Sequence, residues 1–542
     1  MLNALVLLLM SSLANHVTAG SRQPSEAHLE AGNPYMMPLR RESVPIKRHG
    51  KIASFKTTYS GLISVGSPAR QEFRAVFDTG SGHVVLPSAD CGSESCLAHR
   101  RYDMTLSHTA QLINADGTLV EEGEYADQAT IGFGTGQITG EFVQDNLCLG
   151  PGIRPEAVNE SDWLLRPCTD VAIVSAIEMS TQPFKSFKFD GIIGLGLSSL
   201  AVSPAFSFFA ILASKPDFSP RFGFFLTEDD DKEESELALG GYNPSRLLEP
   251  LAWTAVAKAD LGHWQGPIIA VRIDGKVLDL CVDGTCRGIV DTGSSHLGVP
   301  KTHHKEVAEK LTKEAVDILD CRLALAPTVE IELPGVNITV PPMTYMRRLP
   351  LREGVSVSSG KGVTMHPDLV SQARAPPTEG DQMSVLNVNM TTAAGLEVNK
   401  TNVTSNSSRS QASELVATPP PLRSTKRFCR PKTMPVDLPA PLGPKLFILG
   451  EPVLHRYYTV YDWSVPRIGW GLAANRQNMA DPGEEVDRVG SLPDGVDSVL
   501  LQKHVQMDLI QAGSLAETDD FALAQVTVQI RRAARVCLTS TY

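Results

Sequence analysis

Hydrophobic and polar residues alternate along much of the chain between residues 51 and 150, in short runs separated by Gly, Asn, Asp and Pro. Successive side chains of a strand point to opposite faces, so this period of two predicts half-buried strands. Apolar residues at helical spacing are rare, and the better helix candidates are 203–214 and 302–319. We also expect a strand at 343–346. The other expected strands lie in GLISVGSP (61–68), FRAVFDTGSGHVVLP (73–87), EYADQATIGFG (124–134) and GQITGEFVQDNLCLG (136–150). The pattern predicts a mainly β protein.

An internal repeat divides the chain into two related halves. VFDTGSGHVVLP (76–87) returns as IVDTGSSHLGVP (289–300), with Asp, Thr, Gly, Ser, His and Pro at matching positions. Each half also has a later turn of apolar residues and glycine, GIIGLG (191–196) and LFILGEP (446–452). Two copies of one β unit predict two pseudo-symmetric lobes whose Asp-Thr-Gly turns face each other.

The repeat brings two aspartates together, and such a pair has a defined chemistry. A single aspartate is most often a surface or turn residue, but the matching frames favour a catalytic pair, Asp78 and Asp291. Two carboxylates at close range cannot both ionise easily, so they share one proton. The ionised member can take a proton from water while the neutral member polarises a substrate carbonyl. The residues expected to support the pair are Thr79, Gly80, Ser81, Thr292, Gly293 and Ser294, with the serines bonding the outer carboxylate oxygens.

Four motifs, FDTGSG, VDTGSS, FDGIIGLG and FILGEPVLHRYYTVYDWSVPRIGWGLA, resemble those of the pepsin-like aspartic proteases. That family includes cathepsin D and the plasmepsins of protozoan parasites. The resemblance extends from about Phe55 to Ala473, and it implies a bilobal β fold with a cleft between the lobes. It also implies an endopeptidase that acts on proteins or peptides, favours hydrophobic residues and acidic pH, and uses no cofactor or metal. We expect a monomer.

The glycine-rich stretch IGFGTGQITG (131–140) falls in register with the flap of that family, a hairpin that closes over bound peptide. Phe133 stands where the family usually has tyrosine, and Val85 where it usually has tryptophan. The hydrogen bond between these two residues is therefore lost, whereas the aromatic wall is kept. The residues expected to contact substrate are Phe133, Gly134, Thr135 and Val85. A phosphate-binding loop is excluded because the spacing G-x-G-x-x-G is not met.

Cysteines and glycosylation sequons indicate an oxidising compartment. The expected disulfides are Cys91–Cys96, Cys281–Cys286, Cys148–Cys168 and Cys321–Cys429, which leaves Cys537 without an assigned partner. The sequons lie at Asn159, Asn337, Asn389, Asn399, Asn402 and Asn406. We expect the secretory pathway, ending outside the cell, in a vacuole or lysosome, or in a specialised secretory organelle.

The remaining segments define the expected domain organisation. Residues 1–19 have the apolar run and small residues of a signal peptide, with a buried helix as the alternative. The basic segment within 20–52 resembles a short propeptide cut near Arg48, with an ordinary N-terminal strand as an equal alternative. The expected units are the N-terminal lobe 53–250, the C-terminal lobe 251–473, a disordered and glycosylated insertion 348–427 within it, and an extension 474–542 of unknown role.

Several other function classes fit the sequence less well. The net charge of −12, without a basic stripe, argues against a nucleic-acid partner. No segment after the leader is apolar for long enough to span a membrane, so we expect a soluble mature protein. His303 and His304 lack the H-E-x-x-H frame of a metal hydrolase, and G-x-S-x-G is missing. The serious alternative is a catalytically silent pepsin-like glycoprotein that binds a partner.

Overall fold

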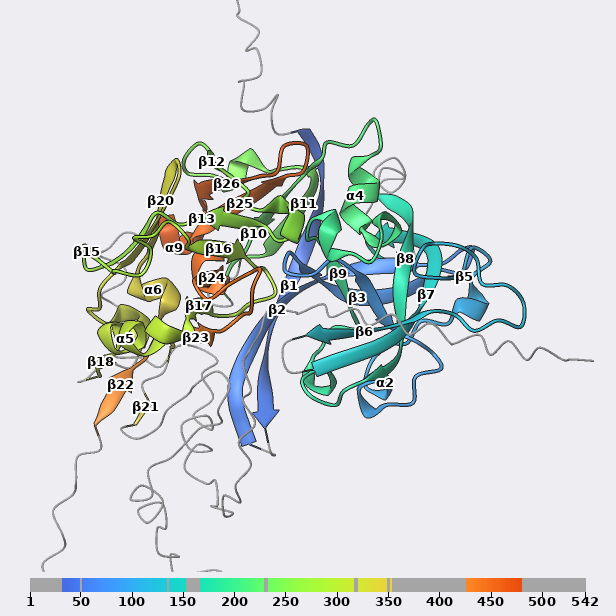
Figure 1. Cartoon of the computed structure of the whole chain (residues 1–542), viewed down its shortest axis with the longest axis horizontal. Helices are drawn as coiled ribbons and strands as arrows, with labels where there is room; N and C mark the ends of the chain where they lie inside the picture. Colours follow the sequence, from blue (N-terminus) through green and yellow to red (C-terminus); the bar gives the residue numbers. More distant parts are fainter. Residues whose placement is uncertain are drawn as a thin grey trace, which may run out of the picture.

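The computed structural model describes residues 32–48, 51–133, 136–152, 166–228, 233–315, 320–348, 351–352 and 426–479. They form two β lobes, with the strands β1 and β2 running between them (Figure 1). The mainly β, bilobal architecture predicted from the sequence is confirmed. The signal peptide, most of the insertion and most of the C-terminal extension lie outside the described residues.

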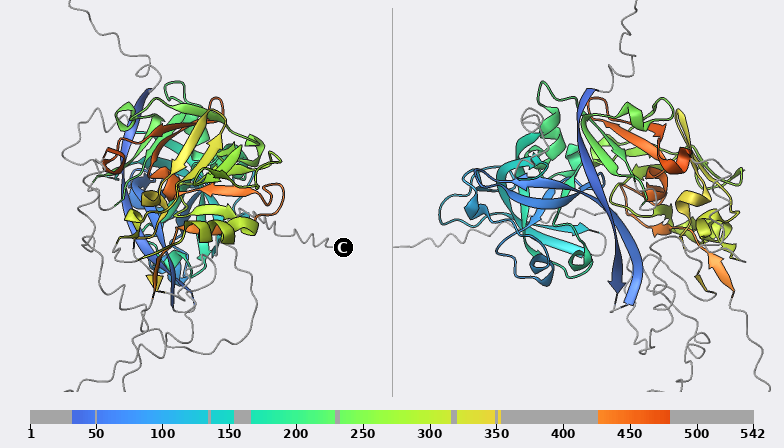
Figure 2. Two further views of the ribbon diagram at one scale, coloured as in Figure 1. Left: turned by 90° about the vertical axis from the view of Figure 1, so that its left-hand side faces the viewer. Right: turned by 180° about the vertical axis from the view of Figure 1, so that it is seen from behind.

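A 14-stranded sheet runs through the molecule in the order β12-β26-β25-β10-β11-β1-β2-β3-β9-β4-β8-β7-β5, and β6 pairs with β7 at its side. Its strands in the first lobe are β1 (Gly32–Arg48), β2 (Lys51–Val65), β3 (Gln71–Asp78), β4 (Val84–Pro87), β5 (Gln111–Ile113), β6 (Gln128–Phe133), β7 (Gly136–Leu149), β8 (Cys168–Met179) and β9 (Gly191–Gly194). The others are β10 (Arg221–Phe225), β11 (Ser235–Gly241), β12 (Ala252–Ala255), β25 (Tyr457–Asp462) and β26 (Arg467–Leu472). One continuous sheet therefore connects the two lobes, as the view from behind shows (Figure 2).

The second lobe has sheets of its own. A 5-stranded sheet contains β13 (Gln265–Pro267), β16 (Arg287–Val290), β24 (Leu446–Leu449), β17 (Leu297–Pro300) and β23 (Thr433–Val436). Two smaller sheets consist of β14 (Ala270–Ile273), β15 (Lys276–Val277), β19 (Val329–Leu333) and β20 (Val336–Val340), and of β18 (Lys313–Glu314), β21 (Leu351–Arg352) and β22 (Arg427–Cys429).

The repeat in the sequence is also a repeat in strand pairing. In the first lobe β3 pairs parallel with β9, and β4 pairs antiparallel with β9 and parallel with β8. In the second lobe β16 pairs parallel with β24, and β17 pairs antiparallel with β24 and parallel with β23. The strands that carry the two Asp-Thr-Gly turns thus occupy equivalent places in the two lobes.

The α-helices of the described residues are short. They are α2 (Glu94–Leu97), α4 (Phe208–Ala213), α5 (Lys301–Leu311), α6 (Pro342–Tyr345), α8 (Glu451–Leu454) and α9 (Arg476–Met479). None of the helices in the described ranges is long and apolar enough to cross a membrane. The candidate 203–214 contains α4, preceded by a single 3-10 turn at Pro204–Phe206.

One predicted helix is shorter than expected, and one predicted strand was wrong. The helix expected at 302–319 ends at Leu311, because the backbone turns extended at Thr312 and the next two residues pair with β22. The strand expected at 343–346 is instead the helical turn α6, which begins after Pro341 with Pro342 in its first position. A proline there lacks only an N–H group that the first helical turn does not use.

The two ends of the insertion meet in the fold. Leu351 pairs with Phe428 and Arg352 with Arg427, so the chain leaves and re-enters the lobe at neighbouring points. The disulfide between Cys321 and Cys429 lies directly beside the return point. An added segment at this place therefore needs no rearrangement of the lobe.

Candidate active site

The two aspartates of the repeat lie together at the ends of equivalent strands. Asp78 is the last residue of β3, and Asp291 follows the last residue of β16. A Cβ atom on Gly293 would stand 2.6 Å from Asp78 Oδ1 and 3.2 Å from Asp291 Oδ1. On Gly80 it would stand 2.9 Å from Asp291 Oδ1 and 3.1 Å from Asp78 Oδ1. Only glycine leaves room for two carboxylates this close to both turns.

Backbone groups orient each carboxylate. The N–H of Gly80 donates to Asp78 Oδ1 over 2.9 Å, and the N–H of Gly293 donates to Asp291 Oδ1 over 2.8 Å. Asp78 is 8% exposed and Asp291 is 7% exposed. Each carboxylate is therefore nearly buried and receives a hydrogen bond from its own turn.

The two threonines hold the turns to each other across the lobe boundary. Thr79 Oγ1 donates to the carbonyl of Val290 over 2.8 Å, and Thr292 Oγ1 donates to the carbonyl of Phe77 over 2.8 Å. Each hydroxyl also accepts the backbone N–H of the other threonine, at 3.0 and 3.1 Å. The network is reciprocal, so movement of one turn relative to the other breaks four buried hydrogen bonds.

The expected role of the serines differs from what the structure shows. Ser81 Oγ is buried and has no hydrogen-bond partner among the described residues, so it does not bond the carboxylate of Asp78. The backbone N–H of Gly80 supplies the bond to that carboxylate instead. The contacts recorded for Ser294 are also backbone contacts, its N–H donating to Asp291 and its carbonyl accepting from Glu451.

The glycine-rich stretch forms a hairpin of β6 and β7 in which Phe133 pairs with Gly136. Gly134, Thr135 and the Phe133 side chain lie outside the described part of the chain. A Cβ on Gly136 would stand 2.6 Å from Phe184 and 2.8 Å from Ser180 Oγ, so glycine permits the close approach next to the turn of the hairpin. The structure gives this glycine a packing role.

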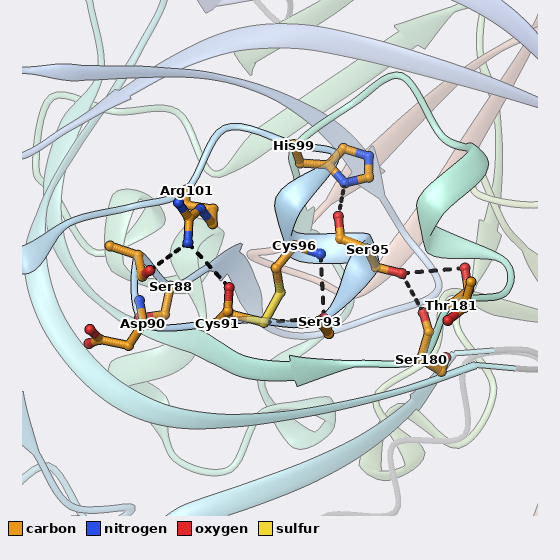
Figure 3. Close-up of a disulfide and its surroundings, with 11 residues drawn as sticks. Ser88, Asp90, Cys91, Ser93, Ser95, Cys96, His99, Arg101, Ser180 and Thr181 are labelled. Atoms are coloured by element: carbon orange, nitrogen blue, oxygen red, sulfur yellow. Dashed lines mark hydrogen bonds between the residues drawn. A yellow bond between two sulfur atoms is a disulfide. The ribbon is translucent and has the colours of Figure 1, made fainter.

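Ser180 connects the turn end of the hairpin to a disulfide-closed turn. Its Oγ accepts the N–H of Gln137 over 3.1 Å, and its own N–H donates to the Gln137 carbonyl over 3.0 Å. Ser95, within the turn closed by Cys91 and Cys96, donates its hydroxyl to the Ser180 carbonyl over 2.7 Å (Figure 3). The small disulfide therefore supports the hairpin through Ser95 and Ser180.

Val85 lies in an aromatic environment. It is 2% exposed and belongs to one core cluster with Phe184, Phe187 and Phe189, the last two stacked at 4.7 Å between ring centroids. These phenylalanines line one small cavity together with Val85. The segment 184–189 thus packs aromatic rings around the small side chain on β4.

Trp264 connects the turns of both aspartates. Its Nε1 donates to the carbonyl of Leu195 over 2.8 Å, and Leu195 in turn donates its N–H to the carbonyl of Asp78 over 2.8 Å. The carbonyl of Trp264 accepts the N–H of Val290 over 2.8 Å. The segment before β13 is therefore held close to the pair.

His263, directly before that tryptophan, is a polar residue at the site that sequence reasoning missed. It is 4% exposed, and its Nδ1 is buried without a hydrogen-bond partner in the described chain. Burial lowers the pKa of His263 to about 4, and the nearby Asp78 carboxylate opposes that shift. His263 lies outside the repeat and is not part of a recognisable motif. The sequence therefore contains no sign that it lies near the aspartates.

The structure contains each disulfide expected from the sequence, Cys91–Cys96, Cys148–Cys168, Cys281–Cys286 and Cys321–Cys429. Cys148 and Cys168 join neighbouring positions on β7 and β8. Asn337 is exposed on β20, whereas the other sequon asparagines, Asn159, Asn389, Asn399, Asn402 and Asn406, lie outside the described residues.

Comparisons with known proteins find similar sequences among aspartyl proteases. The family model described as eukaryotic aspartyl protease matches residues 58–355, which include both aspartates. Cathepsin E of Rattus norvegicus is 32% identical over 296 residues, covering 53% of this chain and 66% of that protein. Cathepsin E of Mus musculus is 30% identical, with the same coverage. Phytepsin of Hordeum vulgare is 26% identical over 504 residues, covering 86% of this chain and 92% of phytepsin. The chain thus spans 66% of the length of these two cathepsin E chains.

Proposed function

Because the chain belongs to the eukaryotic aspartyl protease family, we propose that it is an aspartic endopeptidase whose catalytic groups are Asp78 and Asp291. The observation that carries the proposal is the shared position of the two carboxylates. Both Oδ1 atoms lie within 3.2 Å of the place where a Cβ of Gly293 would stand. The substrates are proteins or peptides, and the reaction needs no metal or cofactor.

The reaction follows from two carboxylates that hold one proton between them. The ionised carboxylate takes a proton from a water molecule, whose oxygen bonds to the carbonyl carbon of the scissile amide. The neutral carboxylic acid gives its proton to the carbonyl oxygen. The tetrahedral diol then collapses: one of its hydroxyls returns a proton to the carboxylate that had been neutral, and the C–N bond breaks. The other carboxyl gives the proton that it took from water to the leaving amine nitrogen, which restores the pair. No bond forms between the protein and the substrate.

The arrangement around the pair supports this chemistry. The reciprocal bonds of Thr79 and Thr292 keep the two carboxylates in one geometry without requiring the substrate to organise them. Under this proposal the hairpin of β6 and β7 covers bound peptide, with Phe133, Gly134 and Thr135 as substrate contacts. Val85 was also expected to contact substrate, but it is 2% exposed and packs in the core with phenylalanines. We also infer cleavage beside hydrophobic residues, an acidic pH preference, a monomer, and a secretory or vacuolar location.

A cleavage assay tests the proposal. The purified protein is incubated with a hydrophobic peptide at about pH 4 to 6, with and without a pepstatin-type inhibitor, beside the Asp291→Ala variant. We expect cleavage by the wild-type protein only, blocked by the inhibitor. No cleavage by either protein across a wide pH range would instead favour a catalytically silent binding glycoprotein.

A further inference from the structure

Two arginines, Arg347 and Arg430, lie opposite each other where the chain leaves and re-enters the second lobe; we call them the arginine pair. Met346 and Pro431 form an antiparallel bridge, and the N–H of Arg347 donates to the carbonyl of Arg430 over 3.0 Å. Arg430 directly follows β22, at one end of the lobe (Figure 1). Like charges directly opposite each other on paired strands are destabilising. The arrangement is therefore unfavourable unless a negative charge offsets it.

Neither guanidinium of the arginine pair forms an ion pair with a carboxylate of the described residues, and both side chains are half-buried. The recorded polar contact of the Arg347 side chain is with His296, whose Nε2 lies 3.4 Å from Arg347 Nη2. Arg430 lies over the ring of Phe428, 6.0 Å from its centroid, and its Nε is buried without a hydrogen-bond partner in the described chain. An unsatisfied buried donor is unusual in a native protein and points to a bound ion or water.

The carboxylates of neighbouring segments already have other partners. Glu228 pairs with Arg322 at 2.6 Å and with Lys432 at 3.4 Å. Asp320 also pairs with Arg322, at 2.6 Å. The nearby Lys432 therefore has a carboxylate to balance its charge, whereas the arginine pair carries an excess of positive charge.

The arginine pair is charged throughout the acidic range. Burial, followed by the neighbouring charge of Arg430, lowers the pKa of Arg347 to about 10, and no acidic group opposes that shift. A group with this pKa is protonated at every acidic pH. The surroundings of Arg347 thus favour an added negative charge.

A disulfide fixes the two segments that carry the arginine pair. Cys429, which is bonded to Cys321, directly precedes Arg430. The N–H of Cys321 donates to the carbonyl of Arg348, the residue after Arg347, over 2.8 Å. Both arginine backbones are therefore in place before a ligand binds, and preorganised groups lose less conformational entropy on binding.

The arginine pair lies near the second aspartate turn. His296, which contacts Arg347, follows Asp291 by only a few residues in the chain. The intervening chain, fully extended, spans at most about 18 Å. A peptide bound at the aspartates in an extended conformation therefore reaches the arginine pair within about six of its own residues.

We propose that the arginine pair is a subsite for an acidic side chain of a bound peptide, within about six residues of the scissile bond. A carboxylate suits this place because a guanidinium presents parallel N–H groups that match its two oxygens. Its negative charge offsets the repulsion between Arg347 and Arg430. This inference rests on the proposed function, because it names a substrate feature of the same site.

Peptides that differ in one acidic residue test the proposal at about pH 6, where glutamate is ionised. A neutral hydrophobic peptide is the parent, and glutamate or glutamine replaces one of its residues at a time. Fluorescence anisotropy measures binding of the labelled peptides to the full-length Asp291→Asn protein. We expect one position at which the glutamate peptide binds at least about tenfold more tightly than the glutamine peptide. Equal binding of the two peptides at every position would overturn the proposal.

Variants of the arginine pair separate a binding role from a structural one. Arg430→Gln and Arg347→Gln, each in the Asp291→Asn background, should remove the preference for glutamate. Their thermal midpoints should be no lower than that of the parent protein, because a like-charge contact is gone. Lys426→Gln is the matched control and should keep the preference, since Lys426 lies on the same returning segment but is exposed and paired with Glu314. A preference that survives in both arginine variants would overturn the proposal.

Cleavage of the neutral parent peptide distinguishes failure of this inference from failure of the proposed function, because it does not need the arginine pair. If the wild-type protein cleaves the parent but the glutamate peptides bind no more tightly than the glutamine peptides, this inference alone is overturned. If a glutamate peptide binds preferentially but no peptide is cleaved, the endopeptidase proposal fails and the arginine pair stands as a binding site.

Discussion

Thr79 and Thr292 each donate a side-chain hydrogen bond to the residue that precedes the other's aspartate, Val290 and Phe77, over the same distance of 2.8 Å. The carboxylates are thus positioned by bonds that cross the lobe boundary, rather than by each lobe alone. This relationship makes the geometry of the pair depend on both halves of the chain. It also explains why threonine follows the aspartate in both turns.

Removing one hydroxyl should loosen both turns. In Thr79→Val the Thr292 N–H and the Val290 carbonyl each lose a buried partner, so we expect a loss of about 1 to 3 kcal/mol in unfolding free energy. Activity should fall more than tenfold. Urea denaturation and kcat/KM measure the two effects. Thr79→Ser keeps the hydroxyl and should retain most of the stability and most of the activity. If Thr79→Val were as stable and as active as Thr79→Ser, the hydroxyl of Thr79 would not hold the two turns together.

The disulfide-closed turn should influence how the hairpin holds substrate. Ser95→Ala removes the hydroxyl that bonds the Ser180 carbonyl, and we expect KM to rise several-fold with kcat nearly unchanged. Ser93→Ala is the control, because the recorded bonds of that hydroxyl stay within the same turn. If both variants change KM equally, the turn acts through its own stability and not through Ser180.

Two buried histidines should weaken the fold in acid. Burial lowers the pKa of His83 and of His263 to about 4, whereas an unfolded histidine titrates near 6.5. Between about pH 6.5 and 4, each of these histidines is therefore protonated in the unfolded chain but neutral in the folded protein. The unfolding free energy falls as the pH drops through this range. At pH 4 each histidine lowers the unfolding free energy by about 3 kcal/mol relative to neutral pH.

His263→Gln should make the unfolding free energy less dependent on pH between about 6.5 and 4. Urea midpoints at the two pH values measure the effect. The exposed His108 serves as the control, since its replacement by glutamine should leave the slope unchanged. A His263→Gln slope equal to that of the wild-type protein would show that this histidine does not titrate between folded and unfolded states as the burial implies.

The insertion should be dispensable for folding. Because Arg352 pairs with Arg427, residues 353–425 can be replaced by a short Gly-Ser turn without moving either strand end. We expect the shortened protein to keep its thermal midpoint within a few degrees and to keep its peptide cleavage rate. Loss of both would show that the segment packs on the lobes.

The sequence predicted the parts of the site that the repeat encodes. The equivalent placement of β3 and β16, and of the turns after them, follows from the matching frames that carry Asp78 and Asp291. The disulfides followed from cysteine spacing and from the family resemblance. Apart from the bridge Cys321–Cys429, which spans 108 residues and was expected from the resemblance, these features depend on residues close together in the chain or on an internal copy.

Other features depend on contacts between distant segments, which a single sequence does not reveal. The end of α5 at Leu311 is determined by pairing with β22, more than a hundred residues later. The place of His263 depends on how Trp264 packs against Leu195. The buried hydrogen bond from Arg41 to Glu451 joins residues that are 410 positions apart. Ser81 was expected to bond the carboxylate of Asp78 because it lies in the same turn. In the structure the backbone N–H of Gly80 makes that hydrogen bond instead.

The central claim is that Asp78 and Asp291 act as one catalytic unit. The most direct measurement is kcat/KM at acidic pH for the wild-type protein, Asp78→Asn, Asp291→Asn and the double variant, with circular dichroism confirming that each is folded. We predict that either single change lowers kcat/KM at least about 1000-fold and that the double change lowers it no further, because residues that act as a unit are not additive. A single variant with near wild-type activity, or losses that multiply in the double variant, would contradict the claim.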